Sequence, residues 1–237
     1  MDGIRENSIL VEKKIAEAVK KSGRRREDVL LVAVSKTKPV EAIQEAVACG
    51  LYYLGENKVQ EIMDKYEPMK ASVQEAVYWH LIGHLQTNKV KYIIDKVDMI
   101  HSLESLKLAQ EIEKRASVKN IVMKVLVEVN IAAESSKFGL RPEEVETFLR
   151  QVASMKHICV KGLMTVAPFV ENPEENRVHF RRLRELLVDI NNKKLDNINM
   201  DVLSMGMTGD YEVAIEEGAT IVRIGTGIFG ERDYFKV

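Results

Sequence analysis

Short apolar runs alternate with longer amphipathic runs along most of the chain. The short runs are rich in Val, Ile and Leu, as the buried strands of a parallel sheet are. In the longer runs, apolar residues recur at the spacing of one helical face, which predicts helices. The predicted strands are 30–36, 51–54, 78–82, 98–102, 121–129, 158–163, 199–204 and 220–224. The predicted helices between them are 39–49, 57–70, 86–95, 104–116, 142–154, 173–192 and 209–217.

Eight strands, each but the last followed by a helix, indicate an α/β protein with a parallel sheet. Eight parallel strands also close a barrel, and 237 residues is an ordinary length for one (β/α)8 TIM-type barrel. An extra N-terminal helix over 1–22 precedes the barrel over 30–230, so we expect a single domain over 1–237. Strand order is not visible in a sequence, which leaves an open doubly wound sheet as the alternative fold.

Composition and charge narrow the class of protein. Hydrophobic residues make up 46% and charged residues 30%, a balance typical of soluble globular proteins. A net charge of −1 gives no general attraction for nucleic acid. The sequence shows no signal peptide and no run long enough to span a membrane, and Cys49 and Cys159 form no CxxC pair. We therefore expect a cytoplasmic protein with reduced thiols, and the lack of a long exposed apolar segment favours a monomer.

Lys36 ends the first predicted strand, directly after the apolar run 30–34 and a serine. A lysine at the end of a buried strand is partly desolvated, and desolvation disfavours its charged ammonium form. The neutral amine is a nucleophile that forms a Schiff base with a carbonyl compound or with pyridoxal 5'-phosphate (PLP). The alternative is a structural lysine whose amine extends to solvent.

Two glycine-rich loops, 204–210 and 223–230, follow or end the last two predicted strands. In an eight-stranded barrel, functional groups gather at the carboxyl ends of the strands, and a phosphate site is often built by these two loops. Glycine lets main-chain N–H groups approach a phosphate closely, and hydroxyl groups add donors. The loops therefore predict a phosphate site, although ordinary tight turns have a similar composition.

Arg223 lies inside the last predicted strand, where an unpaired charge is costly. One explanation is a structural salt bridge. The other is a fixed cation that faces the pyridine nitrogen of PLP, because an arginine does not readily give up a proton and would keep that nitrogen unprotonated. The ring would then be a poor electron sink, and carbanion chemistry would be weak.

Seven motifs between about residue 30 and the end of the chain share an order and spacing with a known family. They are Ala33–Lys38, Gly55–Asn57, His80–Gln86 with Asn88 and Lys89, Ser136–Gly139, Lys161–Met164, Ser204–Met207 and Arg223–Thr226. With these motifs the chain closely resembles the PLP homeostasis proteins, also called YggS/PROSC-like proteins. The resemblance implies a barrel like the N-terminal domain of alanine racemase, with PLP bound in it.

The resemblance also implies roles for individual residues. Lys36 is the lysine that forms the Schiff base with PLP, and Arg223 faces the pyridine nitrogen. Ser204, Gly225 and Thr226 hold the phosphate.

Three further residues are expected near the cofactor by the same resemblance, namely Asn57, His84 and Met205. Position 208 is threonine where serine is common in the family, which keeps a hydroxyl group. Position 84 is histidine where proline is frequent in relatives, so the role of His84 does not follow from the family alone.

His80 and His84 would face the same side of the third predicted strand, an arrangement that two metal ligands require. Zinc needs two or more further ligands, and no nearby cysteine or carboxylate supplies them, so we expect no metal site. Lys137 follows the fifth predicted strand at the presumed active end of the barrel. We treat it as a second cofactor-binding candidate that captures or relays PLP, and the alternative is a surface lysine.

Three functions remain open from the sequence. The first is a PLP carrier or regulator that takes part in intracellular PLP homeostasis, with apo forms of PLP-dependent enzymes as recipients. The second is a PLP-dependent amino-acid racemase, which needs a second base such as Tyr211 or Tyr234. Only about a dozen residues follow the last predicted strand, so we expect no second domain to carry that base. The third is a lysine aldolase without PLP, but no acid and base pair is evident near Lys36.

Overall fold

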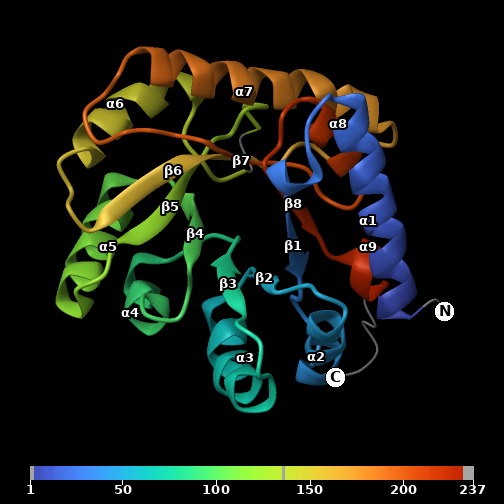
Figure 1. The fold of residues 1–237 in the computed structure, drawn as a ribbon. Coiled ribbons are helices and arrows are strands. Elements are labelled where there is room, and N and C mark those ends of the chain that lie inside the picture. Colours follow the sequence, from blue (N-terminus) through green and yellow to red (C-terminus); the bar gives the residue numbers. More distant parts are fainter. Residues whose placement is uncertain (1–2, 135–136, 232–237) are drawn as a thin grey trace.

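The computed structural model describes residues 3–134 and 137–231, and its eight parallel strands form a closed barrel in the order β1 to β8 (Figure 1). Pairing of β8 with β1, from Leu30 opposite Ile221 to Ala33 opposite Ile224, closes the sheet. The predicted TIM-type barrel is therefore confirmed, and the open doubly wound alternative is wrong. The strands are β1 (Leu30–Val34), β2 (Tyr53–Glu56), β3 (Tyr78–Leu81), β4 (Met99–Leu103), β5 (Met123–Glu128), β6 (Ile158–Met164), β7 (Val202–Ser204) and β8 (Ile221–Ile224).

Helices surround the barrel, and every predicted helical segment contains one (Figure 1). Two predictions need correction. The segment 86–95 is a 3-10 turn followed by a single helical turn, and a short helix after the last strand was not predicted. The helices are α1 (Ile4–Lys21), α2 (Val40–Ala48), α3 (Val59–Ser72), α4 (Val90–Ile93), α5 (Leu106–Lys119), α6 (Pro142–Val152), α7 (Arg177–Asn192), α8 (Tyr211–Glu216) and α9 (Thr226–Phe229), with 3-10 turns η1 (Arg26–Asp28), η2 (Thr87–Lys89) and η3 (Pro173–Asn176).

The first strand is shorter than predicted, and this changes the setting of Lys36. The prediction was 30–36, whereas β1 ends at Val34 and Lys36 lies in a turn. Thr37 adopts a left-handed backbone with φ of 64°, which an extended strand does not allow. The side chain of Lys36 is nevertheless half-buried, as expected for a residue at the mouth of the barrel.

Alternation of side chains along the strands builds two apolar cores. One face of each strand points toward the helices and joins a continuous core that includes Leu31, Leu54 and Ile100. The other face fills the barrel. Its apolar part is a small cluster of Val32, Met99, Leu126, Met164 and Ile221.

The N-terminal helix α1 is the element added to the barrel. It packs against α2, α8 and α9, so it covers the side of the barrel where the first and last strands meet (Figure 1). The Asn7 side chain donates to the carbonyl of Ile228, and Arg24, just beyond the helix, donates to the carbonyl of Ala219. These bonds tie both ends of the helix to the C-terminal part of the barrel.

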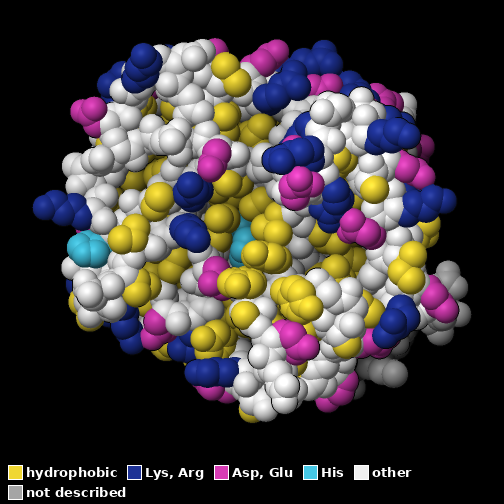
Figure 2. Space-filling view, viewed as in Figure 1, with side chains coloured by type: hydrophobic (Ala, Val, Ile, Leu, Met, Phe, Trp, Pro, Cys, Tyr) yellow, Lys and Arg dark blue, Asp and Glu magenta, His cyan; other side chains and the backbone are white. Residues whose placement is uncertain are grey.

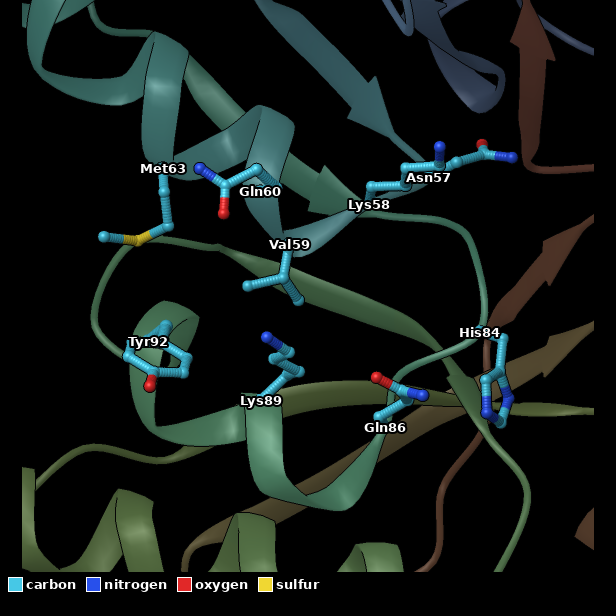
Figure 3. A pocket seen from close by; sticks show the side chains of 9 residues that line it. All are labelled: Asn57, Lys58, Val59, Gln60, Met63, His84, Gln86, Lys89 and Tyr92. Atoms are coloured by element: carbon cyan, nitrogen blue, oxygen red, sulfur yellow. The ribbon is translucent and has the colours of Figure 1, made fainter.

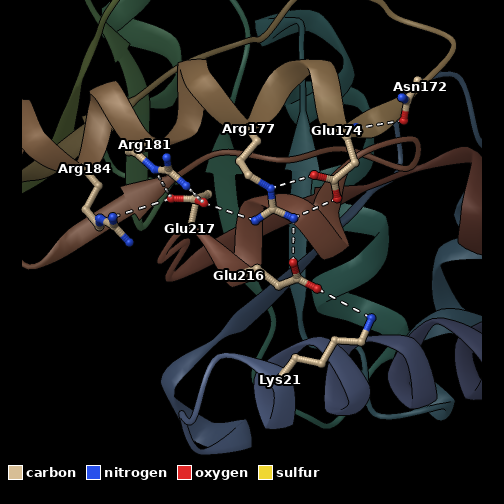
Figure 4. Close-up of polar contacts among 8 residues, drawn as sticks. All are labelled: Lys21, Asn172, Glu174, Arg177, Arg181, Arg184, Glu216 and Glu217. Atoms are coloured by element: carbon tan, nitrogen blue, oxygen red, sulfur yellow. Dashed lines mark hydrogen bonds and ion pairs between the residues drawn. The ribbon is translucent and has the colours of Figure 1, made fainter.

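A network of ion pairs joins α7, α8 and α1 at the amino-terminal side of β8 (Figure 4). Its centre is Glu217, whose side chain is almost fully buried. Burial alone would raise the pKa of Glu217, but hydrogen bonds from Arg181 and Arg177 outweigh it and leave that pKa below its usual range. The network consists of Lys21, Glu174, Arg177, Arg181, Arg184, Glu216 and Glu217.

The outer surface carries charges of both signs. In the space-filling view, Lys, Arg, Asp and Glu are spread over the periphery, and hydrophobic side chains gather nearer the centre (Figure 2). No helix within residues 3–134 and 137–231 is long and apolar enough to cross a membrane. Cys49 and Cys159 are free thiols and are half-buried.

Gly162 in β6 provides a test of the barrel packing. A Cβ atom at this position would lie 1.8 Å from the carbonyl oxygen of Val202 on β7. We expect Gly162→Ala to lower the free energy of unfolding by about 3 kcal/mol, because the two strands would have to separate. Urea denaturation measures this difference. Gly3→Ala is the matched control, since its Cβ would meet nothing closer than 3.7 Å, and an equal loss in both variants would contradict the prediction.

Candidate functional site

A cavity of about 460 Å³ opens at the carboxyl end of the barrel. Its lining residues lie at or after the carboxyl ends of β1, β2, β3, β6, β7 and β8, where functional groups of this fold gather. Five predicted site residues, Lys36, Asn57, Arg223, Gly225 and Thr226, meet here from distant parts of the chain. The lining consists of Val34, Lys36, Lys38, Asn57, Ile82, Val166, Phe169, Met207, Thr208, Gly209, Arg223, Gly225, Thr226 and Gly230.

Lys36 reaches this cavity from the turn that follows β1. Val32 belongs to the cluster inside the barrel, and Val34, the last residue of the strand, lines the cavity. Lys36, two residues further along, lines it as well. Lys38 also lines the cavity, but its amine donates to the carbonyls of Phe229 at 2.9 Å and Gly230 at 3.4 Å. The amine of Lys38 is therefore held by main-chain carbonyls at the border of the cavity.

Arg223 is buried on the barrel axis, with 3% of its surface exposed. Its guanidinium donates to Ser204 Oγ at 2.5 Å and to the carbonyl of Thr165 at 2.8 Å. Among the described residues its hydrogen-bond partners are thus a hydroxyl and a carbonyl, rather than the carboxylate of the salt bridge considered above. Burial lowers the pKa of Arg223 to about 10, although Glu128 and Asp210 act in the opposite direction. The group remains a cation at neutral pH.

A chain of hydrogen bonds extends from Arg223 through the barrel interior. Ser204 Oγ lies 3.0 Å from His101 Nδ1, and His101 Nε2 lies 2.9 Å from His80 Nδ1. Burial holds the pKa of His101 well below its usual range and lowers that of His80 to about 4, so both rings are neutral. Arginine only donates, so Ser204 Oγ accepts from Arg223, and the directions of the other two bonds depend on the tautomers of His101 and His80.

Glu128 adds a titratable group to the barrel interior. Its side chain is buried, and Oε2 has no hydrogen-bond partner. Burial raises the pKa of Glu128 to about 7, with a further contribution from Glu104 and an opposing one from Arg223. The carboxyl group is therefore partly protonated at neutral pH, which limits the negative charge near the guanidinium.

The two glycine-rich loops meet at one wall of the cavity. Gly225 and Thr226 line it directly, as does Thr208 from the loop after β7. The main-chain N–H of Gly227 donates to Thr208 Oγ1 at 3.3 Å, which joins the two loops. A Cβ atom on Gly225 would lie 3.3 Å from the carbonyl of Val34, so a side chain here would crowd β1.

Ser204 and Met205 occupy different places from those expected. Ser204 has no exposed surface, and its hydroxyl is engaged by Arg223 and His101 instead of lining the cavity. Met205 points away from the barrel axis and packs in the core under the helices. The hydroxyl that the loop after β7 presents to the cavity is that of Thr208.

Asn57 links this cavity to a second one, of about 570 Å³, which lies between the start of α3 and the η2–α4 segment (Figure 3). His84 lines only the second cavity. It is exposed, its Nδ1 lies 2.8 Å from Glu104 Oε1, and its ring stacks on Phe138 with ring centroids 4.1 Å apart. His84 is thus a neighbour of the first cavity but not part of its wall.

The expected common orientation of His80 and His84 is wrong. The third strand ends at Leu81, so only His80 follows the inward alternation, and His84 lies in the loop outside the barrel. No group of three or more His, Cys, Asp or Glu residues with metal-binding geometry occurs among residues 3–134 and 137–231.

Lys137 lies in the loop after β5, beside the first cavity. Its amine is 2.6 Å from Glu134 and donates to the carbonyl of Val166 at 3.3 Å. Val166 lines the cavity, so Lys137 contacts a lining residue but does not line the cavity itself. Ser136 and Tyr234, which the sequence analysis named, lie outside the described residues.

Some lining residues were not identified from the sequence. Phe169 lies in the loop after β6 with 99% of its surface exposed, yet it borders the cavity. A phenylalanine in a loop without helical or strand periodicity gives no signal of this kind. Lys38 belonged to a motif of the resemblance, but its contact with the carbonyls after α9 depends on the closure of the barrel.

Comparisons with known proteins agree on one family. The model of the alanine racemase N-terminal domain matches residues 12–233. The chain is 49% identical over 224 residues to a pyridoxal phosphate homeostasis protein of Aquifex aeolicus, covering 94% of this chain and 96% of that protein. A protein of the same name from Vibrio cholerae is 40% identical over 235 residues, or 99% of this chain and 98% of that protein.

Solved structures give the same result. PipY of Synechococcus elongatus, determined with PLP bound, is 31% identical and superposes with a TM-score of 0.79, covering 91% of this chain and all of PipY. An alanine racemase of Clostridium difficile superposes with a TM-score of 0.75 at 15% identity; the match covers 100% of this chain and 59% of the racemase, and it shows a shared fold alone. The fold is thus that of the alanine racemase N-terminal-domain class. The chain belongs to the pyridoxal phosphate homeostasis protein family, which confirms the resemblance seen in its sequence.

The neutral state of His80 predicts a specific loss of stability in acid. Its pKa is about 4 when folded and about 6.5 when unfolded, so below pH 6.5 the unfolded chain takes up a proton that the folded chain does not. Stability should therefore fall as the pH decreases from 6.5 to 4, by roughly 3 kcal/mol from this residue. Chemical denaturation of wild type and His80→Gln at several pH values measures the difference. Glu56 and Glu128 are present in both proteins, so their opposite contributions cancel, and equal acid losses would contradict the prediction.

Proposed function

We propose that this protein holds PLP as a Schiff base on Lys36 and takes part in intracellular PLP homeostasis as a carrier or regulator. The single observation that carries the proposal is the meeting of Lys36, Arg223, Gly225 and Thr226 around one cavity. The names of the relatives and the PLP-bound structure of PipY support it.

The cavity fits PLP in size and in chemistry. Its volume of about 460 Å³ is within the range of small-molecule sites. Lys36 supplies an amine for the aldehyde, and Gly225, Thr226 and Thr208 supply N–H and hydroxyl donors for the phosphate. Bound PLP supplies a reactive aldehyde and an electron-withdrawing ring. Asn57 would contact the cofactor from the side of the second cavity.

Arg223 would face the pyridine nitrogen. The guanidinium is fixed by Ser204 and the carbonyl of Thr165, and it remains charged at neutral pH. A cation with no proton to give keeps the ring nitrogen unprotonated, which weakens carbanion chemistry. This favours storage of PLP over catalysis.

The alternative function, amino-acid racemisation, lacks a suitable second base in the described part of the site. The ionisable residues that line the cavity there are Lys36, Lys38 and Arg223. Tyr211 is buried in the core on α8, and burial raises its pKa to about 12. The third function, a lysine aldolase, would also need a general acid or base near Lys36, and these same lining residues include no carboxylate or histidine.

The proposal also includes transfer of PLP to recipient proteins. The cavity lies at the open end of the barrel, and Phe169 at its border is almost fully exposed. An open site allows exchange of PLP with apo forms of PLP-dependent enzymes more readily than an enclosed one. We propose that the chain does this as a cytoplasmic monomer and as a single domain over 1–237.

Removal of Lys36 tests the covalent link. Purified protein loaded with PLP should be yellow, and Lys36→Ala should be colourless, because the amine of Lys38, the other lysine in the described lining, is bound to the carbonyls of Phe229 and Gly230. Borohydride reduction followed by peptide mass spectrometry should locate PLP on Lys36. Reduced protein should fail to activate an apo-enzyme, whereas unreduced protein should succeed. Attachment to another residue, or a coloured Lys36→Ala variant, would disprove the assignment.

A comparison of two hydroxyl groups tests the phosphate site. We expect Thr226→Val to weaken PLP binding about tenfold or more, because a hydrogen bond to a charged phosphate is worth about 1.5–3 kcal/mol. Competition by inorganic phosphate should weaken in parallel. Ser204→Ala should leave phosphate competition unchanged, because Ser204 Oγ contacts Arg223 and His101. An equal effect of both variants would make Ser204 a phosphate ligand, as the sequence predicted.

A further inference from the structure

Lys65 on α3 is a buried lysine outside the cavity, with 8% of its surface exposed. Its amine donates three hydrogen bonds: to the carbonyl of Ser35 at 2.9 Å, to Glu56 Oε1 at 2.8 Å and to Glu61 Oε2 at 2.9 Å. A lysine ammonium has three protons, so all of them are used. Such a completely bonded ammonium fixes its three partners relative to one another.

These partners hold both neighbours of Lys36. The hydroxyl of Ser35 donates to Glu56 Oε1 at 2.7 Å, so Ser35 is bound through its side chain and its carbonyl. The main-chain N–H of Thr37 donates to Glu61 Oε2 at 2.6 Å. Lys36 is therefore placed between two residues that are bound to the same ammonium and its two carboxylates.

The network also has a cost that a purely apolar contact would avoid. Burial raises the pKa of Glu56 to about 7 despite Lys65, and Glu56 Oε2 has no hydrogen-bond partner. Thr37 has a φ of 64°, a left-handed conformation that is strained for a residue other than glycine. A strained turn and a costly buried cluster at the same place indicate a functional constraint on the backbone at Lys36.

The network lies on the side of β1 opposite to the cavity. Ser35 points toward α3, Lys36 points into the barrel, and Ser35, Glu56, Glu61 and Lys65 do not line the cavity. Its members cannot contact a ligand there directly. Any effect on the ligand has to pass through the backbone of residues 35–37.

We propose that Lys65 is a positioning residue that, through Glu56 and Glu61, aims the amine of Lys36 into the cavity and so sets the rate at which it bonds to the aldehyde of PLP. The inference rests on the proposed function, because it concerns the same lysine. The inference adds Lys65, which contacts neither the ligand nor the cavity.

Two ligands separate this role from a general loss of structure. PLP tests the position of the Lys36 amine, because the bond between them requires the aldehyde of PLP. The corresponding phosphorylated alcohol has the same ring and phosphate but no aldehyde, so it tests the cavity alone. In Lys65→Met, the visible absorbance of the bound Schiff base should form roughly tenfold or more slowly, because small displacements of a reacting group have effects of this size. The affinity for the alcohol should stay within about twofold of wild type.

Two substitutions at Glu61 test the same inference in case Lys65→Met does not fold. Glu61 is only partly buried, so its variants should fold. Glu61→Ala removes the acceptor for the N–H of Thr37 and should slow bond formation, whereas Glu61→Gln keeps an acceptor oxygen and should restore most of the rate. Glu217→Gln disturbs a buried carboxylate at the opposite end of the barrel and should lower stability without slowing the reaction.

The outcomes distinguish the two proposals. If wild type attaches no PLP to Lys36, the proposed function fails. If wild type does so and Lys65→Met and Glu61→Ala react as fast, Lys65 has no positioning role. Equal weakening of PLP and of the alcohol in these variants would also overturn the inference, because it would show a deformed cavity.

Discussion

The passage from strand to turn at the end of β1 is the constraint on which the site depends. Val34, the last residue of β1, and Lys36, in the turn after it, line the cavity, whereas Ser35 between them bonds to Lys65 on α3. On the inner side is a cavity with cationic groups. On the outer side is a saturated network of hydrogen bonds around Lys65. The fold thereby separates the amine that we propose to react from the groups that we propose to hold it.

A second organising feature is the polar layer across the barrel interior. Beside the small apolar cluster, His80, His101, Ser204 and Arg223 form a continuous hydrogen-bonded chain from four different strands. A buried guanidinium is costly unless it is hydrogen-bonded, and the two neutral imidazoles extend the network without adding charge. Among the described residues, Ser204 and the carbonyl of Thr165 bond the cation, and no carboxylate bonds it directly.

Much of the fold could be predicted from the sequence, because eight apolar runs between amphipathic helices leave few arrangements. The positions of individual side chains were harder. The period of β3 suggested that His84 faces inward, but the strand ends at Leu81. Ser204 was expected at the phosphate, yet the closed barrel brings it beside Arg223. Lys65 resembles any helical lysine in the sequence, since two of its three partners, Ser35 and Glu56, come from other segments of the chain.

The charges around the cavity affect which small molecules approach it. Within the described residues, Lys36, Lys38 and Arg223 line it and no carboxylate does. A concave wall lined by cations favours the approach of anions such as a phosphate ester. A protein whose net charge is only −1 therefore presents a locally cationic site to small molecules.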